Sequence, residues 1–553
     1  MRVGLARAAF ELESVRYAAR SLATILAEQH ELCYLQPGFD YSTWFERERA
    51  ADAMVERCDV VVGFVSDPTV ALLLAARQRR KLRVPFIVFV LGAFPRGAAG
   101  IRQIAADLTT NDTLVVNCAA DADLARRFFS NARIALIPFA LEDNVYFPVS
   151  DHDRFEIRRQ LGCNETTPLV LYAGRITVEK NVHSVIRVFA MVQRAWPDCR
   201  LILAGPMLDF PFLECGVVPI GYGRTIANVA GAMQVSPSSL QCVGVVPPDR
   251  LRALYNAADV VLNLTLNHDE NFGFAQVEAL ACGTPVVGTA WGGLRDTIRE
   301  GENGLTVSVV VTPLGVKVNW WEAVNNTLLV LAAHRERSGR ERVQRSSRRY
   351  LRGAYEAELQ SLVAAVTAES RAKETPLRTT TFARRYWDTC LSPESPTARY
   401  EPGTPSFALY QRLIQSYAST SAASLSVDAQ FEEDQVVSLA MPVRHLRGDL
   451  LEIDDPLYPF ELVLSRQLLR RVSQILIAMN EQPAITVRHL AETCGASSRA
   501  CWAPLRWMQA RGLVLRSAAN GSWLDPHVID NRMSQPLFSK QRVALASTDF
   551  LLF

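Results

Sequence analysis

Two glutamates with seven residues between them, Glu270 and Glu278, lie in a segment whose neighbours favour binding of a polar ligand. Gly273 allows a tight turn and a close approach of the backbone, because it has no Cβ atom. A helix is expected over 274–281, since a glycine and then a proline follow it as stop signals. Amides at the start of such a helix suit a phosphate or sugar hydroxyls, and the two oxygens of Glu278 can accept hydrogen bonds from both hydroxyls of a ribose.

Two cationic residues, Arg175 and Lys180, follow a strand that is expected at 169–172. They lie at its carboxyl end, where open α/β sheets bind their ligands. Gly174 permits a sharp exit from this strand, Arg175 can fork onto phosphate oxygens, and Lys180 adds a mobile point charge. Lysine occurs at only five positions of the chain, so a lysine at this place stands out from the composition. Together these residue types indicate a site for a phosphorylated ligand.

The run 267–287 resembles the signature of retaining glycosyltransferases of family 4, which have the GT-B fold. That signature has two glutamates separated by seven residues, with Phe-Gly after the first and Glu-Ala-x-Ala-x-Gly-x-Pro-Val-Val at its close. Every one of these positions is filled here. The resemblance implies that Glu270 contacts the transferred sugar and that Glu278 contacts the ribose of the nucleotide.

The segment 174–181 is similar to the family's Gly-Arg…Lys-Gly motif, whose two cations neutralise the diphosphate of the donor. Those roles fall on Arg175 and Lys180, with Asn181 in place of the usual glycine. The link between the two halves also departs from the family, because it reads Pro-Phe-Ala at 138–140 instead of Pro-Asn-Gly. The resemblance implies front-face transfer, in which the leaving diphosphate takes the proton of the acceptor.

The catalytic candidates are therefore Glu270, Arg175 and Lys180. The candidate donor-binding residues are Gly174, Arg175, Lys180, His268, Glu270, Asn271, Phe272, Gly273, Phe274 and Glu278. We expect no metal ligands and no cofactor, because the two cations make a divalent ion unnecessary and no Asp-x-Asp pair occurs where the donor should lie. Gly292 and Gly293 could add backbone amides for a phosphate, whereas Asp259 is interpreted as structural.

The composition excludes several classes of protein. A chain of 553 residues exceeds one hydrophobic core and indicates three or four domains. With 49% hydrophobic residues it is mostly globular, and a net charge of +2 is too small to imply nucleic acid as a bulk partner. Eleven cysteines without a Cys-x-x-Cys pair argue against a disulfide framework or a zinc site. The start lacks a signal peptide, so we expect a cytoplasmic protein, with peripheral membrane contact left open.

The first 345 residues alternate apolar strands with helices, which is the pattern of doubly wound parallel sheets. In 1–150, strands are expected at 2–6, 31–35, 59–65, 86–91, 113–117 and 134–137, with the clearest helix at 12–28. In 151–345, strands are expected at 169–172, 200–204, 241–245, 260–264, 285–288 and 304–307. The predicted fold is thus α/β of the GT-B type, with an acceptor-side Rossmann-like domain facing a nucleotide-sugar-binding one.

Other segments have their own expectations. The segment 206–240 is interpreted as an insertion near the mouth of the cleft. A helix in 346–370 is expected to return to the first domain, as in GT-B enzymes. Residues 371–460 are interpreted as a linker and irregular region, with little structure before about residue 405, because Thr, Ser, Pro and Arg dominate there. A chain truncated after about residue 372 is therefore expected to fold and to use its donor slowly.

The region 461–526 resembles a winged helix-turn-helix, an α+β appendage followed by a tail at 527–553. Helices are expected at 464–479, 486–494 and 497–511, and a hairpin at 513–523 around Asn520-Gly521. The module is mildly basic, but Pro504 would kink the helix that reads DNA. We therefore favour docking of a protein or peptide over DNA binding.

The sequence predicts transfer of a sugar from a nucleotide-diphosphate donor, UDP- or GDP-linked, to an acceptor hydroxyl with retention at the anomeric carbon. One alternative is a GT-B epimerase or phosphorylase. Another is a regulator that senses nucleotide sugars while its appended module binds DNA. The base, the sugar and the acceptor are left open.

Overall fold

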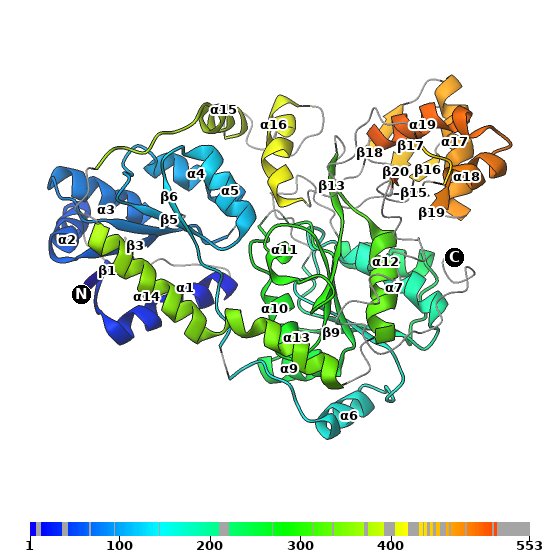
Figure 1. The fold of residues 1–553 in the computed structure, drawn as a ribbon, viewed down its shortest axis with the longest axis horizontal. Helices are drawn as coiled ribbons and strands as arrows, with labels where there is room; N and C mark the ends of the chain where they lie inside the picture. The colour runs from blue at the N-terminus through cyan, green and yellow to red at the C-terminus, as the bar shows by residue number, and fades with distance from the viewer. Residues whose placement is uncertain are drawn as a thin grey trace.

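Figure 1 shows the structure, a computed structural model of the chain. It describes all residues except 7–12, 36–42, 66–67, 93, 143, 209–220, 268, 313–314, 334–336, 370–373, 392–403, 419–430, 435, 440–442, 446–449, 454–459, 464–465, 482–483, 511–513 and 517–553. Two α/β domains lie side by side, and a helical segment and a smaller module follow them in the chain (Figure 1).

The first domain is built on a six-stranded parallel sheet with the order β2-β1-β3-β4-β5-β6. Its strands are β1 (Arg2–Ala6), β2 (Glu31–Leu35), β3 (Val60–Phe64), β4 (Phe86–Phe89), β5 (Thr113–Val116) and β6 (Arg133–Leu136). Its helices are α1 (Glu13–Gln29), α2 (Trp44–Arg57), α3 (Pro68–Arg79), α4 (Phe94–Ile104) and α5 (Ala119–Phe128). The buried strands β3, β4 and β5 read as apolar runs, as expected for a parallel sheet covered on both faces.

The second domain repeats this design with the strand order β12-β11-β10-β7-β8-β9, again all parallel. Its strands are β7 (Leu169–Ala173), β8 (Arg200–Ala204), β9 (Leu240–Gly244), β10 (Val260–Asn263), β11 (Val286–Thr289) and β12 (Gly304–Val307). Its helices are α6 (Asp151–Gln160), α7 (Val182–Ala195), α8 (Tyr222–Ala232), α9 (Pro248–Ala257), α10 (Phe274–Ala281), α11 (Leu294–Thr297), α12 (Trp320–Ala333) and α13 (Arg337–Ser346). The predicted α/β architecture of two Rossmann-like domains is confirmed.

The strand order reverses between β7 and β10, which are neighbours in the second sheet although far apart in sequence. Open α/β sheets bind ligands beyond the carboxyl ends of strands at such a switch point. Segment 174–181 follows β7 and segment 264–273 follows β10. The two predicted motifs therefore emerge side by side from one edge of the sheet.

The predicted return helix is present. A short 3₁₀ helix, η3 (Ser347–Tyr350), leads into α14 (Arg352–Glu369), which crosses to the first domain (Figure 1). Its buried side chains, Leu359 and Val363 among them, pack in one cluster with Val3 and Val62 of the first sheet. The link between the domains is thus made twice, once near residue 140 and once by α14.

Residues 209–220 of the predicted insertion 206–240 lie outside the described residues. Helix α8 lies between the parallel neighbours β8 and β9 and is the ordinary crossover connection of that pair. A different addition occurs after β12, where β13 (Val309–Thr312) and β14 (Gly315–Val318) form an antiparallel hairpin before α12. Each strand of this hairpin is only four residues long, so the sequence analysis did not separate it from its surroundings.

The expectation of little structure between 370 and 405 is wrong in its middle. Helix α15 (Thr381–Cys390) buries one aromatic face, and the rings of Phe382, Tyr386 and Trp387 all contact Phe128 of α5 edge-on. Composition suggested a linker, but the aromatic residues at helical spacing carry enough apolar area to hold this segment on the first domain. Helix α16 (Pro405–Ile414) and the 3₁₀ turn η5 (Gln415–Tyr417) follow it.

The C-terminal module contains the three predicted helices as α17 (Arg466–Glu481), α18 (Val487–Thr493) and α19 (Ser498–Ala510), with Pro504 inside the last. Its sheet has the order β19-β15-β20, from Ala484–Thr486, Val436–Leu439 and Val514–Arg516. Strand β20 thus pairs with β15, which precedes the helices, while Asn520 and Gly521 of the predicted hairpin lie outside the described residues. Strands β16 (Val443–His445), β17 (Leu450–Ile453) and β18 (Phe460–Val463) form a second antiparallel sheet.

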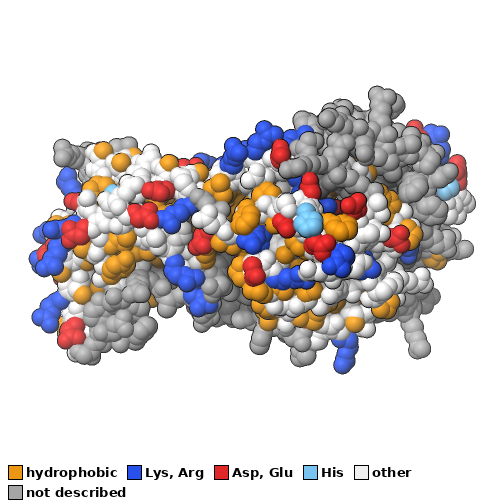
Figure 2. Space-filling view, turned by 90° about the horizontal axis from the view of Figure 1, so that it is seen from below, with side chains coloured by type: hydrophobic (Ala, Val, Ile, Leu, Met, Phe, Trp, Pro, Cys, Tyr) orange, Lys and Arg blue, Asp and Glu red, His pale blue; other side chains and the backbone are white. Residues whose placement is uncertain are grey.

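Figure 2 shows basic and acidic side chains interspersed with hydrophobic ones over the two Rossmann-like domains. This mixing agrees with the net charge of +2. Among the helices that the structure describes, none combines the length and the apolar character that crossing a bilayer requires.

Candidate functional site

A pocket of about 440 Å³ opens at the carboxyl edge of the second sheet, between the two domains. Its walls are the ends of β7, β8 and β10 and the start of α10, while Gly92 and Phe139 come from the first domain and the link. Nine of the ten predicted donor-binding residues line it: Gly174, Arg175, Lys180, Glu270, Asn271, Phe272, Gly273, Phe274 and Glu278. The tenth, His268, lies outside the described residues.

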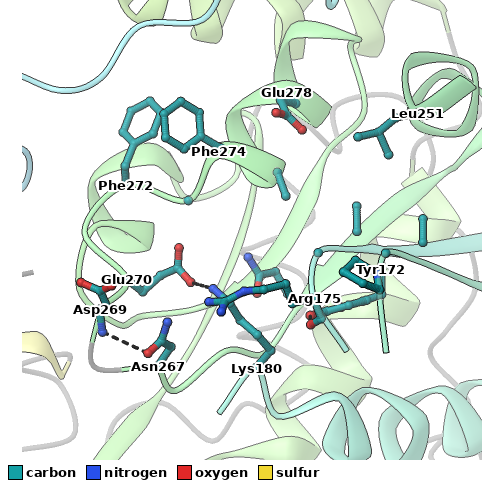
Figure 3. A pocket seen from close by; sticks show the side chains of 18 of the residues that line it. Tyr172, Arg175, Lys180, Leu251, Asn267, Asp269, Glu270, Phe272, Phe274 and Glu278 are labelled. Carbon is teal, nitrogen blue, oxygen red and sulfur yellow. Dashed lines mark hydrogen bonds and ion pairs between the residues drawn. The ribbon is translucent and has the colours of Figure 1, made fainter. Parts of the chain in front are cut away.

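Lys180 and Glu270 form a direct ion pair inside this pocket (Figure 3). Their side chains are 17% and 11% exposed, so the pair is weakly screened by water. The predicted phosphate-binding cation and the predicted sugar-binding carboxylate therefore neutralise one another in the pocket. A ligand that binds either group would compete with this pair or share its remaining donors and acceptors.

Arg175 has a different carboxylate partner. Its Nη2 atom lies 3.9 Å from Oε1 of Glu179, whose side chain is fully buried. No hydrogen bond to the Glu179 carboxylate oxygens is present among the described residues. A buried carboxylate at this distance attracts the guanidinium and keeps it near the pocket wall. Sequence reasoning did not single out Glu179, although it directly precedes Lys180 in the motif.

Glu278 lies on α10 at the other side of the pocket (Figure 3). The hydroxyl of Tyr255 donates a hydrogen bond of 2.8 Å to its Oε2 atom. Burial raises the pKa of Glu278 to about 7, and hydrogen bonds from Tyr255 and Tyr146 oppose that rise. Glu278 is therefore a poised carboxyl group that a ligand with hydroxyl donors would stabilise in its ionised form.

Gly273 begins α10 with φ of +83°, in the left-handed region that favours glycine. A Cβ atom there would also collide with the side chain of Leu294. The neighbouring rings pack together: Phe272 meets Phe274 edge-on at 4.9 Å, and Phe139 stacks on Phe274 at 5.6 Å. The start of α10 is thus held close to the link between the domains. Gly273 forms the tight turn that the sequence predicted.

Asn271 lines the pocket but also joins the domains, because its Nδ2 atom donates to Oδ1 of Asn117 at 3.1 Å. Asp269 is a pocket residue that the sequence analysis missed, although it is adjacent to Glu270. It faces Gly92 across the cleft, where a Cβ atom on Gly92 would lie 2.7 Å from Oδ1 of Asp269. This acidic residue therefore lies at the boundary with the first domain.

The glycine pair 292–293 does not offer its amides to a ligand. The N–H group of Gly292 donates to the carbonyl of Tyr417, and that of Gly293 donates to the carbonyl of Glu270, each at 2.9 Å. The suggested role in phosphate binding is therefore wrong for both residues as the structure has them.

Asp259 is structural, as predicted, because it accepts hydrogen bonds from Arg154, Arg158 and the amide of Leu169.

The end of the pocket near β8 and β9 is apolar. Val245, Val246 and Leu251 line it together with the backbone at Gly205 and Pro206. Val245 is 75% exposed and directly follows the edge strand β9. Such a flat apolar surface beside backbone polar groups suits the face and edge of an aromatic base. The pocket thus combines an apolar end, two cations and several carboxylates.

Comparison with known proteins gives an independent finding. Residues 153–325 match the family model described as glycosyl transferases group 1. The D-inositol 3-phosphate glycosyltransferase of Corynebacterium urealyticum is 31% identical over 202 residues, which are 35% of this chain and 45% of that protein. Its counterpart in Corynebacterium efficiens is 30% identical over 263 residues, 47% of this chain and 58% of that protein. The chain thus spans about half the length of these relatives.

Among solved structures, Anabaena HepE in complex with UDP and glucose aligns with a TM-score of 0.49 at 17% identity, over 66% of this chain and 100% of that one. Residues 153–325, which make up most of the second Rossmann-like domain, are thus similar to the glycosyl transferases group 1 family. This domain contains both predicted motifs and most of the pocket wall.

Proposed function

We propose that the protein is a retaining glycosyltransferase of family 4 that transfers a sugar from a UDP- or GDP-linked donor to an acceptor hydroxyl. The observation that carries this proposal is the convergence of Arg175, Lys180, Glu270 and Glu278 on one pocket at the switch point of a group 1 domain. The relatives named above are glycosyltransferases, which supports the same reaction class. The polyol phosphate in their name suggests a class of acceptor to assay first.

The dimensions and polarity of the pocket suit a nucleotide sugar in one orientation. We place the base at the apolar end beside Val245 and the ribose hydroxyls on Glu278. The diphosphate then lies between Arg175 and Lys180, and the sugar reaches Glu270 near the first domain. In this orientation the reacting carbon faces the cleft between the domains, where an acceptor can enter.

Binding of the diphosphate would open the ion pair between Lys180 and Glu270. Lys180 then compensates the charge that develops on the leaving phosphate, and Glu270 becomes free to accept a hydrogen bond from the sugar. Catalysis in this proposal depends on positioning and on charge stabilisation, with the departing diphosphate taking the acceptor proton. We propose that no metal ion is required, because the two cations supply the positive charge.

The test begins with native mass spectrometry of the protein against UDP-glucose, UDP-N-acetylglucosamine and GDP-mannose. The donor that binds is then incubated with inositol phosphate or with water alone, and release of nucleotide diphosphate is measured in the presence of EDTA. We expect release in wild type and a loss of about 10²–10³-fold in Arg175→Ala. Arg159→Ala, at an exposed arginine paired with Glu156, serves as the control.

Proton NMR of the product decides the stereochemistry, because retention gives the anomeric configuration of the donor. A donor that binds and is altered without release of nucleotide diphosphate would instead indicate an epimerase. Absence of binding by every nucleotide sugar would contradict the proposal.

A further inference from the structure

The chain beyond the two Rossmann-like domains returns to the cleft between them. Helix α16 lies beside α15 and above α11 (Figure 1), and the 3₁₀ turn η5 that follows it contacts α5 of the first domain. On the first domain, Arg127 donates through Nη1 to Oγ of Ser416 at 3.0 Å and to the carbonyl of Arg412 at 3.3 Å. The hydroxyl of Tyr417 donates to Oδ1 of Asp121 on α5, and both side chains are fully buried.

The same short segment is bonded to the second domain. Arg295 donates through Nη1 to the carbonyls of Ser416 and Ala418, at 3.1 and 2.8 Å. The carbonyl of Tyr417 accepts the amide of Gly292 at 2.9 Å. The ring of Tyr417 lies against the ring of Trp291, with 5.6 Å between the centroids. Tyr417 therefore holds one domain with its hydroxyl and the other with its carbonyl and ring.

The residues that Tyr417 contacts in the second domain support the loop that carries Glu270. The indole N–H group of Trp291 donates to the carbonyl of Asn267 at 2.8 Å. The amide of Gly293, next to Gly292, donates to the carbonyl of Glu270 at 2.9 Å. Both ends of the segment 267–270 are thus bonded to the 291–293 turn, which lies directly on Tyr417.

Space around Tyr417 is tight on this side. A Cβ atom on Gly292 would lie 2.8 Å from Cδ1 of Tyr417, and the φ of Gly292 is +52°. A larger residue at 292 would therefore push the ring away or move the turn. Gly292 is thus packed between the ring of Tyr417 and the carbonyl oxygen of Glu270, which a Cβ atom would approach to 2.2 Å.

Ionisation of the Asp121 carboxyl group is unfavourable because the group is buried. Burial raises its pKa to about 7, while the hydrogen bonds from Tyr417 and the Phe94 amide oppose the rise. Cys118 and Asp269 are the other titratable groups that face it. A buried hydroxyl–carboxyl bond is strengthened by the low local dielectric and is expensive to break.

We propose that Tyr417 is a positioning residue of the site, which couples the placement of the first domain to the geometry of the loop carrying Glu270. This inference rests on the proposed function for its catalytic consequence, but the coupling itself is a property of the fold. When the hydroxyl bond to Asp121 is present, the turn 291–293 and the segment 267–270 are held in one position relative to both domains. When it is lost, the loop samples other positions and Glu270 is misplaced during transfer.

The experiment uses the full chain and two variants of matched chemistry. Tyr417→Phe keeps the ring and the carbonyl contact and removes only the hydroxyl. Tyr386→Phe, at a fully buried tyrosine on α15 that packs on Phe128, is the control. Hydrogen–deuterium exchange of peptides covering 263–273 and 289–295 is measured by mass spectrometry, with UDP and without it. We expect exchange in these peptides to be roughly tenfold faster in Tyr417→Phe, as loss of one such bond implies, and unchanged in the control.

Steady-state hydrolysis of UDP-glucose gives the catalytic consequence. We expect kcat to fall while the KM for UDP-glucose stays near its wild-type value, because the contacts to the nucleotide are elsewhere in the pocket. Asp121→Asn keeps an acceptor for the Tyr417 hydroxyl and should retain most of the wild-type protection from exchange. Asp121→Ala removes this acceptor, so its exchange in the two peptides should be as fast as that of Tyr417→Phe.

Equal exchange in Tyr417→Phe and wild type would overturn the coupling, and so would faster exchange throughout the chain with no excess in the two peptides. If the wild type releases no nucleotide from any donor, the proposed function fails, yet the exchange measurement still decides whether Tyr417 holds this loop.

Discussion

Lys180 and Glu270 form an ion pair in the pocket, so the two groups with the clearest predicted roles lie in direct contact with each other. Both side chains are largely buried, which makes their attraction stronger than that of a surface pair. A diphosphate that binds Lys180 must replace this attraction. The pair therefore links recognition of the phosphate to the release of the carboxylate that is expected to contact the sugar.

Substitution of Glu270 should separate binding from turnover. In Glu270→Gln, Lys180 loses its charged partner and meets the diphosphate without competition, so the Kd for UDP should stay equal or decrease. Turnover of the donor should fall by about 10²–10³-fold, since a contact to the reacting sugar is lost. Isothermal titration with UDP and a nucleotide-release assay measure the two effects. A weaker affinity for UDP in Glu270→Gln would argue against the competition between carboxylate and phosphate.

Substitution of Glu278 should change both stability and nucleotide binding. Its pKa is raised to about 7 in the folded protein from an ordinary value of 4.5, so folding disfavours the ionised form. The contribution of Glu278 to the free energy of unfolding therefore decreases as the pH rises from about 4.5 to 7, and it stays low above that range. Glu278→Gln cannot ionise, so its melting temperature relative to wild type should rise between pH 5 and pH 8. At the same time its affinity for UDP should fall, because the ribose hydroxyls lose a charged acceptor.

Thermal melts of Glu278→Gln at the two pH values are compared with those of Glu302→Gln. Glu302 is a half-exposed carboxylate paired with Arg299, and its variant should follow wild type at both pH values. A melting-temperature difference for Glu278→Gln that is constant with pH would show that the carboxyl is not strained by burial.

The sequence predicted the parts of the fold that depend on local signals. Helix α10 has the predicted bounds because Gly273 and Gly283 both take positive φ at its ends. The motif residues meet in one pocket because they follow adjacent parallel strands, which is a rule of topology. Contacts between distant segments have no such local signal. Tyr417 lies 296 residues from Asp121, and no periodicity around either residue indicates the pairing.

The winged-helix expectation shows the same limit. The three helices were predicted from apolar periodicity and caps, and all of them are present. The turn and second strand of the hairpin predicted around Asn520-Gly521 lie outside the described residues, while β20 pairs with β15, some 75 residues earlier in the chain, which was not predicted. The choice of a strand's partner depends on the shape of the whole module, because any exposed edge of suitable register can accept it. In α15 a signal existed, since Phe382, Tyr386 and Trp387 recur at helical spacing, but the composition of the surrounding segment masked it.

Removal of Asp259 should destabilise the second domain without touching the pocket. Asp259 pairs with Arg154 at 2.7 Å and with Arg158 at 3.2 Å, and the side chain of Arg158 is only 1% exposed. Asp259→Ala leaves this buried guanidinium without its counter-charge, which should cost about 3 kcal/mol. Urea unfolding followed by tryptophan fluorescence measures the loss. Asp123→Ala removes an exposed pair with Arg126 and should change little, so equal effects of the two variants would contradict a structural role for Asp259.

Truncation should define how much chain the two Rossmann-like domains need. The motifs and α14 all lie before residue 370, and for this reason the sequence predicted that a chain truncated near residue 372 would still function. The structure changes this expectation, because such a chain lacks α15 and Tyr417 and exposes the fully buried Phe128. We expect residues 1–418 to stay monomeric with a melting temperature near that of the full chain, and residues 1–372 to melt lower or to aggregate. Size-exclusion chromatography and calorimetry measure both, and equal behaviour of the two fragments would show that the segment 374–418 adds no stability.

The C-terminal module should act on the acceptor side and not on DNA. Its core of α17, α18 and α19 includes Val472, Leu490 and Leu505, and Val310 of the β13–β14 hairpin packs against that core. The module is thus attached to the second Rossmann-like domain, on the side away from the first domain (Figure 1), and the role proposed for it is to hold an acceptor or its carrier. We expect residues 1–418 to hydrolyse UDP-glucose at the rate of the full chain but to transfer sugar to the acceptor at least tenfold more slowly.

Gel-shift titration of the full chain with mixed-sequence duplex DNA at two salt concentrations checks the alternative, which is DNA binding by the module. Tight binding that weakens steeply with salt would show phosphate contacts, and would replace docking by DNA recognition as the role of this module.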